Sequence, residues 1–254
     1  MSKALKKHAE LEKLFGSDFL PLSKSPASPG RDSATSPKDV ASAKPASATS
    51  GASVASARPG AGPKIDQWNW PADYLALREE ALGCRKCGLC ETRTQVVFGV
   101  GRLDAPLLFV GEAPGADEDI QGEPFVGKAG QLLTKTLAKH GVSRDKVHIA
   151  NILKCRPPGN RTPAPDEMAA CLPWLRRQID AIRPKVLCAL GNIAAQTLLE
   201  TKTGITRLRG KYADGLGRKI FPTFHPAYIL RNMGELPQFE ADILQACKDA
   251  GLAG

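Results

Sequence analysis

The chain has 254 residues, of which 42% are hydrophobic and 24% charged, and its formal net charge is +9. This composition is typical of one globular domain with further residues beside it. No apolar run approaches the roughly 20 residues of a membrane-spanning helix, and the N-terminus lacks the apolar core and cleavage site of a secretory signal. The positive charge indicates a polyanionic partner such as a nucleic acid, although a solvated basic surface would also explain it.

Residues 21–64 differ in composition from the rest of the chain. Of these 44 residues, 31 are Ala, Ser, Pro or Gly, so the segment cannot bury enough apolar surface to offset its ordering entropy. We therefore predict a disordered linker there. Residues 1–20 could form a short amphipathic helix that docks a protein partner, although such a helix alone is marginal in water. Residues 65–254 are predicted to form the globular domain.

From residue 65 onward, short apolar runs alternate with helical periodicity. Apolar runs with the length and composition of buried strands occur at 107–110, 147–151, 186–190 and 220–224. Helical spacing and helix-end signals occur at 71–82, 128–140, 165–182, 192–200 and 236–250. Strands separated by helices favour a parallel sheet covered on both faces. The predicted fold class is α/β, with three αβα layers and a central, mostly parallel four-stranded sheet.

Polar segments rich in Gly and Pro follow the first, second and fourth predicted strands. They are GEAPGADED from residue 111, NILKCRPPGNRTP from residue 151 and HPAYILR from residue 225. Ligands of parallel α/β sheets bind beyond the carboxyl ends of the strands. We therefore expect these three segments to form one site.

The seven cysteines, with no secretory signal before them, favour a metal site plus ordinary thiols over a disulfide framework. Cys84 and Cys87 form a C-x2-C pair, and 15 residues separate Cys155 from Cys171. Four such thiolates can hold zinc or a [4Fe–4S] cluster, and spacing alone leaves both open, with zinc slightly favoured. Cys90 extends the pair to C-x2-C-x2-C, so it is either a spare thiol or a rival to Cys171.

Several residues of these segments could carry chemistry, and each also has a purely structural explanation. Pro114 and Gly115 lie in a tight turn that lets the backbone approach a ligand or phosphate. Phe125 is either a core residue or a platform for a planar base. Asn151 either caps a turn or presents a donor and an acceptor to a pyrimidine edge. His225 is either a structural histidine or a catalytic one.

Together these motifs resemble the family 4 uracil-DNA glycosylases, the iron–sulfur branch of the uracil-DNA glycosylase superfamily. The resemblance covers roughly residues 75–250 and is specific, because separate motifs recur in the expected order and spacing. The motifs are CRKC, LLFVGEAPGADEDIQGEPFVGKAGQLL, NILKCRPPGNRTPAPDEMAAC, VLCALGNIAA, GITRLRG and FHPAYILR. The resemblance implies a base excision repair enzyme that flips uracil out of DNA, hydrolyses its N-glycosidic bond and leaves an abasic site.

The resemblance also implies a structural [4Fe–4S] cluster on Cys84, Cys87, Cys155 and Cys171, with Cys90 outside the ligand set. It further implies a monomer that acts in the bacterial cytoplasm, at the nucleoid, on single- or double-stranded DNA. The alternative class is a non-catalytic nucleic-acid-binding module with a four-cysteine metal site. Among enzymes, the alternative is a glycosylase for a wider range of deaminated bases.

Roles for the pocket residues follow from the same resemblance. Phe125 would stack on the uracil, and Asn151 would hydrogen-bond its edge and reject cytosine. His225 would stabilise the charge that develops on uracil O2 as the base leaves. Pro114 and Gly115 would support the phosphate of the flipped nucleotide.

The resemblance leaves two roles less sharply assigned. Ile229 or Leu230 would fill the gap left in the duplex, with Arg231 on a phosphate.

The second role that the resemblance leaves open is that of the group that positions the attacking water. Ala113 occupies the place of the water-activating Asp of the best-known branch, so Glu112 is the first candidate and Glu118 the second. A relative that captures uracil-DNA covalently uses a His after the second site strand. The corresponding segment here, KCRPPGNRTPAPDE, contains no His, so we predict turnover.

Overall fold

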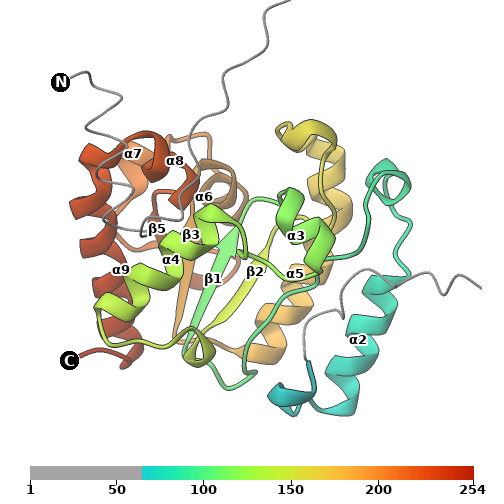
Figure 1. Cartoon of the computed structure of the whole chain (residues 1–254), viewed down its shortest axis with the longest axis horizontal. Coiled ribbons are helices and arrows are strands. Elements are labelled where there is room, and N and C mark those ends of the chain that lie inside the picture. Colours follow the sequence, from blue (N-terminus) through green and yellow to red (C-terminus); the bar gives the residue numbers. More distant parts are fainter. Residues whose placement is uncertain (1–64) are drawn as a thin grey trace, which may run out of the picture. The chain divides into compact units, whose positions relative to one another are not determined.

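The structure, a computed structural model, describes residues 65–254, and the predictions for residues 1–20 and 21–64 lie outside this part. The described residues form a three-layer α/β domain with a five-stranded sheet between helices (Figure 1). In spatial order the strands are β2 (His148–Asn151), β1 (Leu107–Gly111), β3 (Val186–Leu190), β5 (Arg218–Thr223) and β4 (Ala213–Gly215).

The helices predicted from periodicity are all present, with ends that agree to within one residue. They are α2 (Ala72–Leu82), α4 (Lys128–Lys139), α5 (Pro165–Ile182), α6 (Asn192–Leu199) and α9 (Leu236–Ala250). Periodicity did not predict the short helices α3 (Ala116–Gln121), α7 (Ile205–Leu208) and α8 (Pro226–Arg231). Short 3-10 turns are η1 (Ile65–Trp68), η2 (Gly88–Glu91), η3 (Arg144–Lys146), η4 (Pro158–Asn160) and η5 (Met233–Glu235).

Alternate residues of the strands face opposite helical layers. Leu108, Leu187 and Ile220 are neighbours across β1, β3 and β5, and they share a buried cluster with residues of α5 and α6. Phe109 and Phe221, each one residue further along, face the opposite side, where α9 packs on the sheet. Burial on both faces explains why these strands read as continuous apolar runs.

The prediction of four strands was one strand short. β4 (Ala213–Gly215) pairs antiparallel with β5 at the edge of the sheet, while the other pairings are parallel. Leu216 and Gly217, in the turn between these strands, both have positive φ, as a tight hairpin turn requires. The sequence Ala-Asp-Gly has neither the length nor the β-branched residues that identify a strand, which is why the pattern missed it.

A second buried cluster packs α2 and the segment before it beside α5. Trp70, Tyr74 and Trp174 belong to it, and so do the side chains of Cys155 and Cys171. Two thiols of the predicted metal site, Cys155 and Cys171, are therefore buried in an apolar cluster, while Cys84 and Cys87 are partly buried against it.

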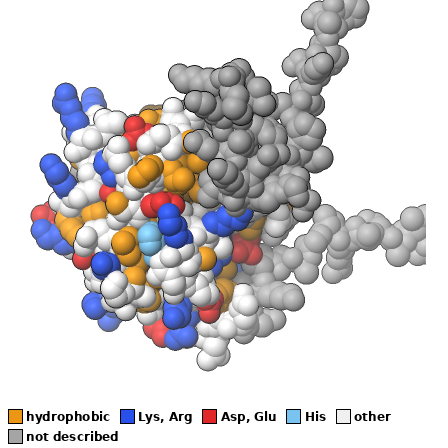
Figure 2. Space-filling view, turned by 60° about the vertical axis from the view of Figure 1, so that its left-hand side comes forward, with side chains coloured by type: hydrophobic (Ala, Val, Ile, Leu, Met, Phe, Trp, Pro, Cys, Tyr) orange, Lys and Arg blue, Asp and Glu red, His pale blue; other side chains and the backbone are white. Residues whose placement is uncertain are grey.

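The surface shows no concentration of charge on the face drawn in Figure 2. Lys and Arg side chains lie there in several separate places, with acidic and hydrophobic side chains between them. Among residues 65–254, no helix is long and apolar enough to cross a membrane.

Candidate active site and four-cysteine site

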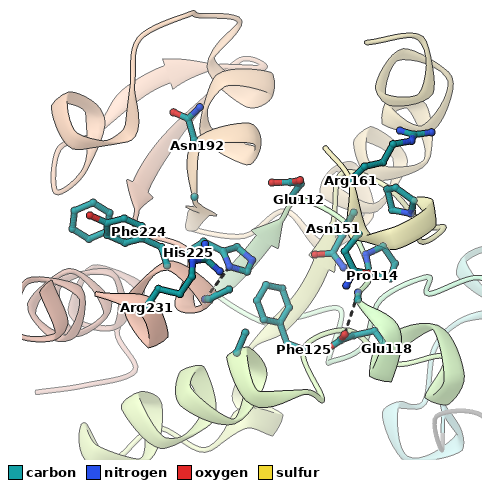
Figure 3. Close-up of a pocket in the computed structure, with 18 of the residues that line it drawn as sticks. Glu112, Pro114, Glu118, Phe125, Asn151, Arg161, Asn192, Phe224, His225 and Arg231 are labelled. Carbon is teal, nitrogen blue, oxygen red and sulfur yellow. Dashed lines mark hydrogen bonds between the residues drawn. The ribbon is translucent and has the colours of Figure 1, made fainter. Parts of the chain in front are cut away.

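A cavity of about 530 Å³ lies at the carboxyl ends of β1, β2, β3 and β5, and we call it the strand-end pocket. Figure 3 shows Glu112 projecting between the side that carries His225 and the side that carries Asn151. The structure thus brings together eight of the residues predicted for this site, which are Glu112, Pro114, Gly115, Glu118, Phe125, Asn151, His225 and Arg231.

Phe125 forms one wall of the pocket and lies beside His225, with ring centroids 5.5 Å apart and ring planes inclined by 33°. Its backbone has φ of 55°, an unfavourable value for a residue with a side chain. Two glycines make room for it. A Cβ at Gly111 would lie 2.6 Å from the Phe125 ring, and one at Gly130 would collide with the Phe125 carbonyl. The fold therefore holds this ring in a constrained position.

Asn151 ends β2 and is only 2% exposed. Its Oδ1 atom has no hydrogen-bond partner among the described residues. A buried polar atom without a partner costs about 1–3 kcal/mol. Because this atom belongs to a residue that lines the pocket, a ligand that donates a hydrogen bond would satisfy it.

His225 is held in a defined tautomer at the start of α8. The backbone N–H of Ala227 donates to His225 Nδ1 over 3.1 Å, so the proton of the neutral ring lies on Nε2. Burial and, to a lesser extent, the positive charge of Arg231 together lower the pKa of this imidazole to about 4. A Cβ at Gly191 would lie 2.7 Å from His225 Cβ, so glycine is needed there. At neutral pH the ring is therefore a neutral hydrogen-bond donor.

The two acidic candidates differ in what their carboxylates contact. Glu118 accepts hydrogen bonds from the backbone N–H groups of Val126 and Gly127, both 2.9 Å, and of Gly115, 3.1 Å. Glu118 therefore ties together the two halves of the loop after β1. The carboxylate of Glu112 has no hydrogen-bond partner within residues 65–254, and burial raises its pKa. Of the two, only Glu112 presents an uncommitted carboxylate to the pocket.

The predicted phosphate support needs refinement at Gly115. Pro114 and Gly115 both line the pocket, but the Gly115 N–H is already bonded to Glu118. Any phosphate contact there must use other atoms of the turn or displace this carboxylate.

The prediction of Ile229 as a residue inserted into DNA was wrong. The segment after His225 forms α8, and Ile229 faces inward with 0% exposure. Leu230, one helical position on, is half-buried, and Arg231 is exposed and lines the pocket. The sequence suggested an open loop, whereas the helical turn separates these neighbours onto different faces.

Other residues of the pocket were missed by the sequence pattern. Asn192 follows β3, and its Oδ1 accepts a hydrogen bond from the backbone of Ile205 over 3.1 Å. Arg161, from the segment after β2, pairs with Glu167 through two hydrogen bonds of 2.8 and 2.5 Å. A signal for Asn192 existed, because the third strand ends at the same edge as the other three. Other missed lining residues are Ala129, Pro157, Asn160, Phe224, Ala227 and Tyr228.

The predicted cysteine ligands surround a separate small cavity, the four-cysteine site. It is lined by Cys84, Cys87, Cys155 and Cys171, and also by Cys90. Within residues 65–254 no three His, Cys, Asp or Glu side chains lie close enough together to hold a single metal ion. The surroundings of the thiols show whether they suit a larger group such as an iron–sulfur cluster.

Those surroundings contain hydrogen bonds to sulfur. Arg93 Nη1 donates to Cys155 Sγ over 3.1 Å, and the backbone N–H of Lys154 donates to Cys171 Sγ over 3.2 Å. Donors of this kind stabilise thiolates and tune the clusters that thiolates bind. The donor set therefore fits a thiolate-bound group, and Cys90 lines the same cavity without such a hydrogen bond to its sulfur among the described residues.

The fold and the strand-end pocket have counterparts among known proteins. A sequence model of the uracil DNA glycosylase superfamily matches residues 98–248, the part of the chain that contains the sheet and every loop of the pocket.

Individual relatives narrow the assignment. A type-4 uracil-DNA glycosylase of Thermotoga maritima is 50% identical over 156 residues, 61% of this chain and 81% of the relative. Its counterpart from Archaeoglobus fulgidus is 46% identical over 171 residues, 64% of this chain and 86% of the relative. One from Pyrobaculum aerophilum is 42% identical over 186 residues, 67% of this chain and 91% of the relative. The chain therefore belongs to the type-4 branch of the uracil-DNA glycosylase superfamily.

Proposed function

We propose that the strand-end pocket hydrolyses the N-glycosidic bond of uracil in DNA and leaves an abasic site. The observation that carries this proposal is the buried Oδ1 of Asn151, which lacks a partner in a pocket that also holds a neutral histidine. Names of the relatives support the same activity. The target nucleotide must leave the base stack to reach such a pocket.

The Phe125 ring and the Asn151 amide would recognise the base from two sides of the pocket. The Phe125 ring offers a face for stacking. The Asn151 amide can accept from the uracil N3–H through Oδ1 and donate to the adjacent carbonyl through Nδ2. Cytosine reverses this donor and acceptor order, so the same amide would reject it.

Departure of the base leaves negative charge on the uracil ring. The Nε2–H of neutral His225 would donate to uracil O2 and stabilise that charge. Because Ala227 holds the other ring nitrogen, the donor is oriented before the reaction starts. Glu112, with its uncommitted carboxylate, would position the attacking water at the sugar carbon.

We also propose that Cys84, Cys87, Cys155 and Cys171 hold a [4Fe–4S] cluster. The shared cavity and the N–H donors to sulfur support this ligand set. When bound, the cluster would cross-link the segment after α2 to the segment after β2 and to α5, and it would take no part in hydrolysis. On the DNA side, Leu230 would fill the vacated stack and Arg231 would contact a phosphate. The monomeric state and a partner for residues 1–20 stay predictions.

The first test is an excision assay on an oligonucleotide with a single labelled uracil opposite guanine. Strand cleavage at the uracil only after hot alkali is the expected result, since a monofunctional glycosylase leaves an intact backbone. Asn151→Asp should lower the excision rate by roughly 10- to 100-fold, because it replaces the amide that reads uracil with a charged acceptor. Unchanged excision by this variant would remove Asn151 from its role.

That assay needs a control for the cluster. Iron and sulfide are measured in each preparation, and DNA binding by the Asn151→Asp protein is compared with the wild type. Wild-type protein that carries the cluster, binds DNA and produces no alkali-labile site would contradict the proposed activity.

A further inference from the structure

A buried ammonium group lies between the strand-end pocket and the four-cysteine site. Lys154 is 2% exposed, although lysine is almost never fully buried without a partner. Its Nζ donates to the backbone carbonyl of Asn151 over 2.9 Å and to Gln178 Oε1 over 2.5 Å. The side chain thus folds back onto the residue that reads the base in the proposed reaction.

The other end of the same residue contacts the cysteines. The backbone N–H of Lys154 donates to Cys171 Sγ over 3.2 Å, and Cys155 is the next residue in the chain. Lys154 also lines the four-cysteine cavity. One residue therefore touches the proposed uracil reader through its ammonium and the proposed cluster ligands through its backbone.

The partners of this ammonium are fixed in place. Gln178 Nε2 donates to the Tyr74 hydroxyl over 3.2 Å and to the Phe98 carbonyl over 3.0 Å, so its Oε1 must point to Lys154. Lys154 Nζ also lies 6.0 Å from the centre of the Phe98 ring. The whole network is buried in the described domain, which leaves the lysine side chain little freedom to move.

The charge of this network is not balanced by a carboxylate. Within residues 65–254 no Asp or Glu pairs with Lys154, and its two acceptors are neutral amide oxygens. A buried charge is strongly unfavourable unless an opposite charge compensates it. The groups on this side of the domain that would carry negative charge when they bind a cluster are the cysteines of the four-cysteine site, and Cys171 among them accepts the Lys154 backbone N–H.

We propose that Lys154 is a positioning residue that couples the four-cysteine site to uracil recognition. The negative charge of the thiolate-bound cluster keeps the ammonium buried, and the ammonium holds the backbone of Asn151 so that its amide faces the base. This inference rests on the proposed function and on the proposed cluster.

The test compares Lys154→Met with the wild-type holoprotein. Methionine retains an unbranched chain but removes the charge and both hydrogen bonds. Two quantities are measured that need no turnover. One is the reduction midpoint potential of the cluster, and the other is the dissociation constant for free uracil, measured by ligand-observed NMR.

We expect both quantities to change. Loss of a neighbouring positive charge should make the midpoint more negative, since reduction adds negative charge to the cluster. The dissociation constant for uracil should rise roughly tenfold, because Asn151 loses the hydrogen bond from a charged group that orients it. In the excision assay, KM should rise more than kcat falls.

Lys86→Met is the matched control. Lys86 lines the same cavity, but it is exposed and its ammonium lies over the Trp174 ring, 4.4 Å from the centroid. This variant should leave uracil affinity unchanged. Equal loss of affinity in both lysine variants would overturn the proposal, because Lys86 has no contact with Asn151.

Gln178→Met covers the case in which Lys154→Met fails to fold or to retain iron. It keeps the ammonium but removes the second acceptor that fixes Nζ beside the Asn151 carbonyl, so the cluster should remain while uracil affinity falls less than in Lys154→Met. Iron-loaded Lys154→Met or Gln178→Met protein with unchanged uracil affinity would overturn the coupling. Wild-type protein without iron would overturn both the coupling and the cluster, whereas iron-loaded protein inactive on uracil-DNA would contradict the proposed function alone.

Discussion

The strand-end pocket and the four-cysteine site come within four residues of each other in the sequence, at Asn151 and Cys155, yet their polar groups differ in their hydrogen bonding. In the pocket, Asn151 Oδ1 and the Glu112 carboxylate lack partners within the described domain. In the cysteine site, sulfur atoms of Cys155 and Cys171 accept hydrogen bonds from Arg93 and Lys154. Polar groups without hydrogen-bond partners suit a ligand that binds and dissociates, whereas sulfur atoms that already accept hydrogen bonds suit a permanently bound group.

The two sites also differ in how much space surrounds them. The four-cysteine site is part of a buried aromatic and aliphatic cluster, whereas the pocket is a cavity of about 530 Å³ formed by loops. Changes in the cysteine site should therefore act first on stability. Changes in the pocket should act first on excision, with the fold intact.

The largest effect is expected from losing a cluster ligand. Cys84→Ser should abolish most iron binding and lower the free energy of unfolding by several kcal/mol, because cluster binding and folding are coupled. Iron per protein and a urea unfolding curve measure this. Cys90→Ser should retain its iron, and Cys188→Ala, which removes a buried thiol of β3 outside the site, is the control. Iron loss in Cys90→Ser but not in Cys84→Ser would reverse the ligand assignment.

Within the pocket, His225→Ala should have the greatest effect. Loss of the donor to uracil O2 should slow single-turnover excision by about 10²–10³-fold, with iron content and unfolding free energy close to the wild type. His140→Ala is the matched control, since His140 caps α4 away from the pocket and bonds to the Glu240 carbonyl. A His225→Ala rate within a few-fold of the wild type would remove this histidine from catalysis.

Acid should lower the free energy of unfolding of the domain through His148. This ring is fully buried and stacks on Trp70 with centroids 6.3 Å apart, and burial lowers its pKa to about 4. Between pH 6.5 and 4 the unfolded chain binds a proton that the folded ring does not, so stability falls as the pH is lowered. The decrease amounts to about 3 kcal/mol for this group and is absent above pH 6.5.

Chemical unfolding at pH 7 and pH 5 measures this dependence. His148→Gln should have a smaller loss of stability on acidification, and His225, whose pKa is also about 4, should account for part of the remainder. An equal pH dependence in the wild type and His148→Gln would show that the buried ring does not control acid stability.

The smallest effect on excision is expected on α8, where substitutions of the neighbours Leu230 and Ile229 should have different consequences. Leu230→Ala should slow excision several-fold from duplex DNA but not from single strands, where no vacated stack needs filling. Ile229→Ala should instead lower the unfolding free energy by about 2–5 kcal/mol, since it removes a fully buried side chain. Equal effects of Leu230→Ala on both substrates would rule out the wedge role.

Much of the fold was predictable because it depends on local patterns. Continuous apolar runs identified β1, β2, β3 and β5, and helical spacing identified the long helices, since both reflect burial that repeats along the chain. β4 and α8 are too short for such repetition. Their existence depends on neighbours, the edge of β5 for one and the packing of Ile229 for the other.

The pocket was predictable only in part, for a related reason. The shared sheet edge was enough to place Asn151 and His225 together, whereas Phe125 was added to them only by the family resemblance. Sequence pattern could not separate Glu112 from Glu118, because the difference lies in which backbone N–H groups face each carboxylate.

Residue order and periodicity thus predicted the α/β architecture, and the motifs predicted the family and the sheet edge at which the pocket lies. Tertiary structure alone decided which polar atoms of those sites remain unpaired, which nitrogen of His225 carries its proton and why Lys154 lies between them. Periodicity reports burial averaged over a segment. Hydrogen bonding and charge balance depend on individual atoms that residues distant in the chain bring within about 3 Å of each other.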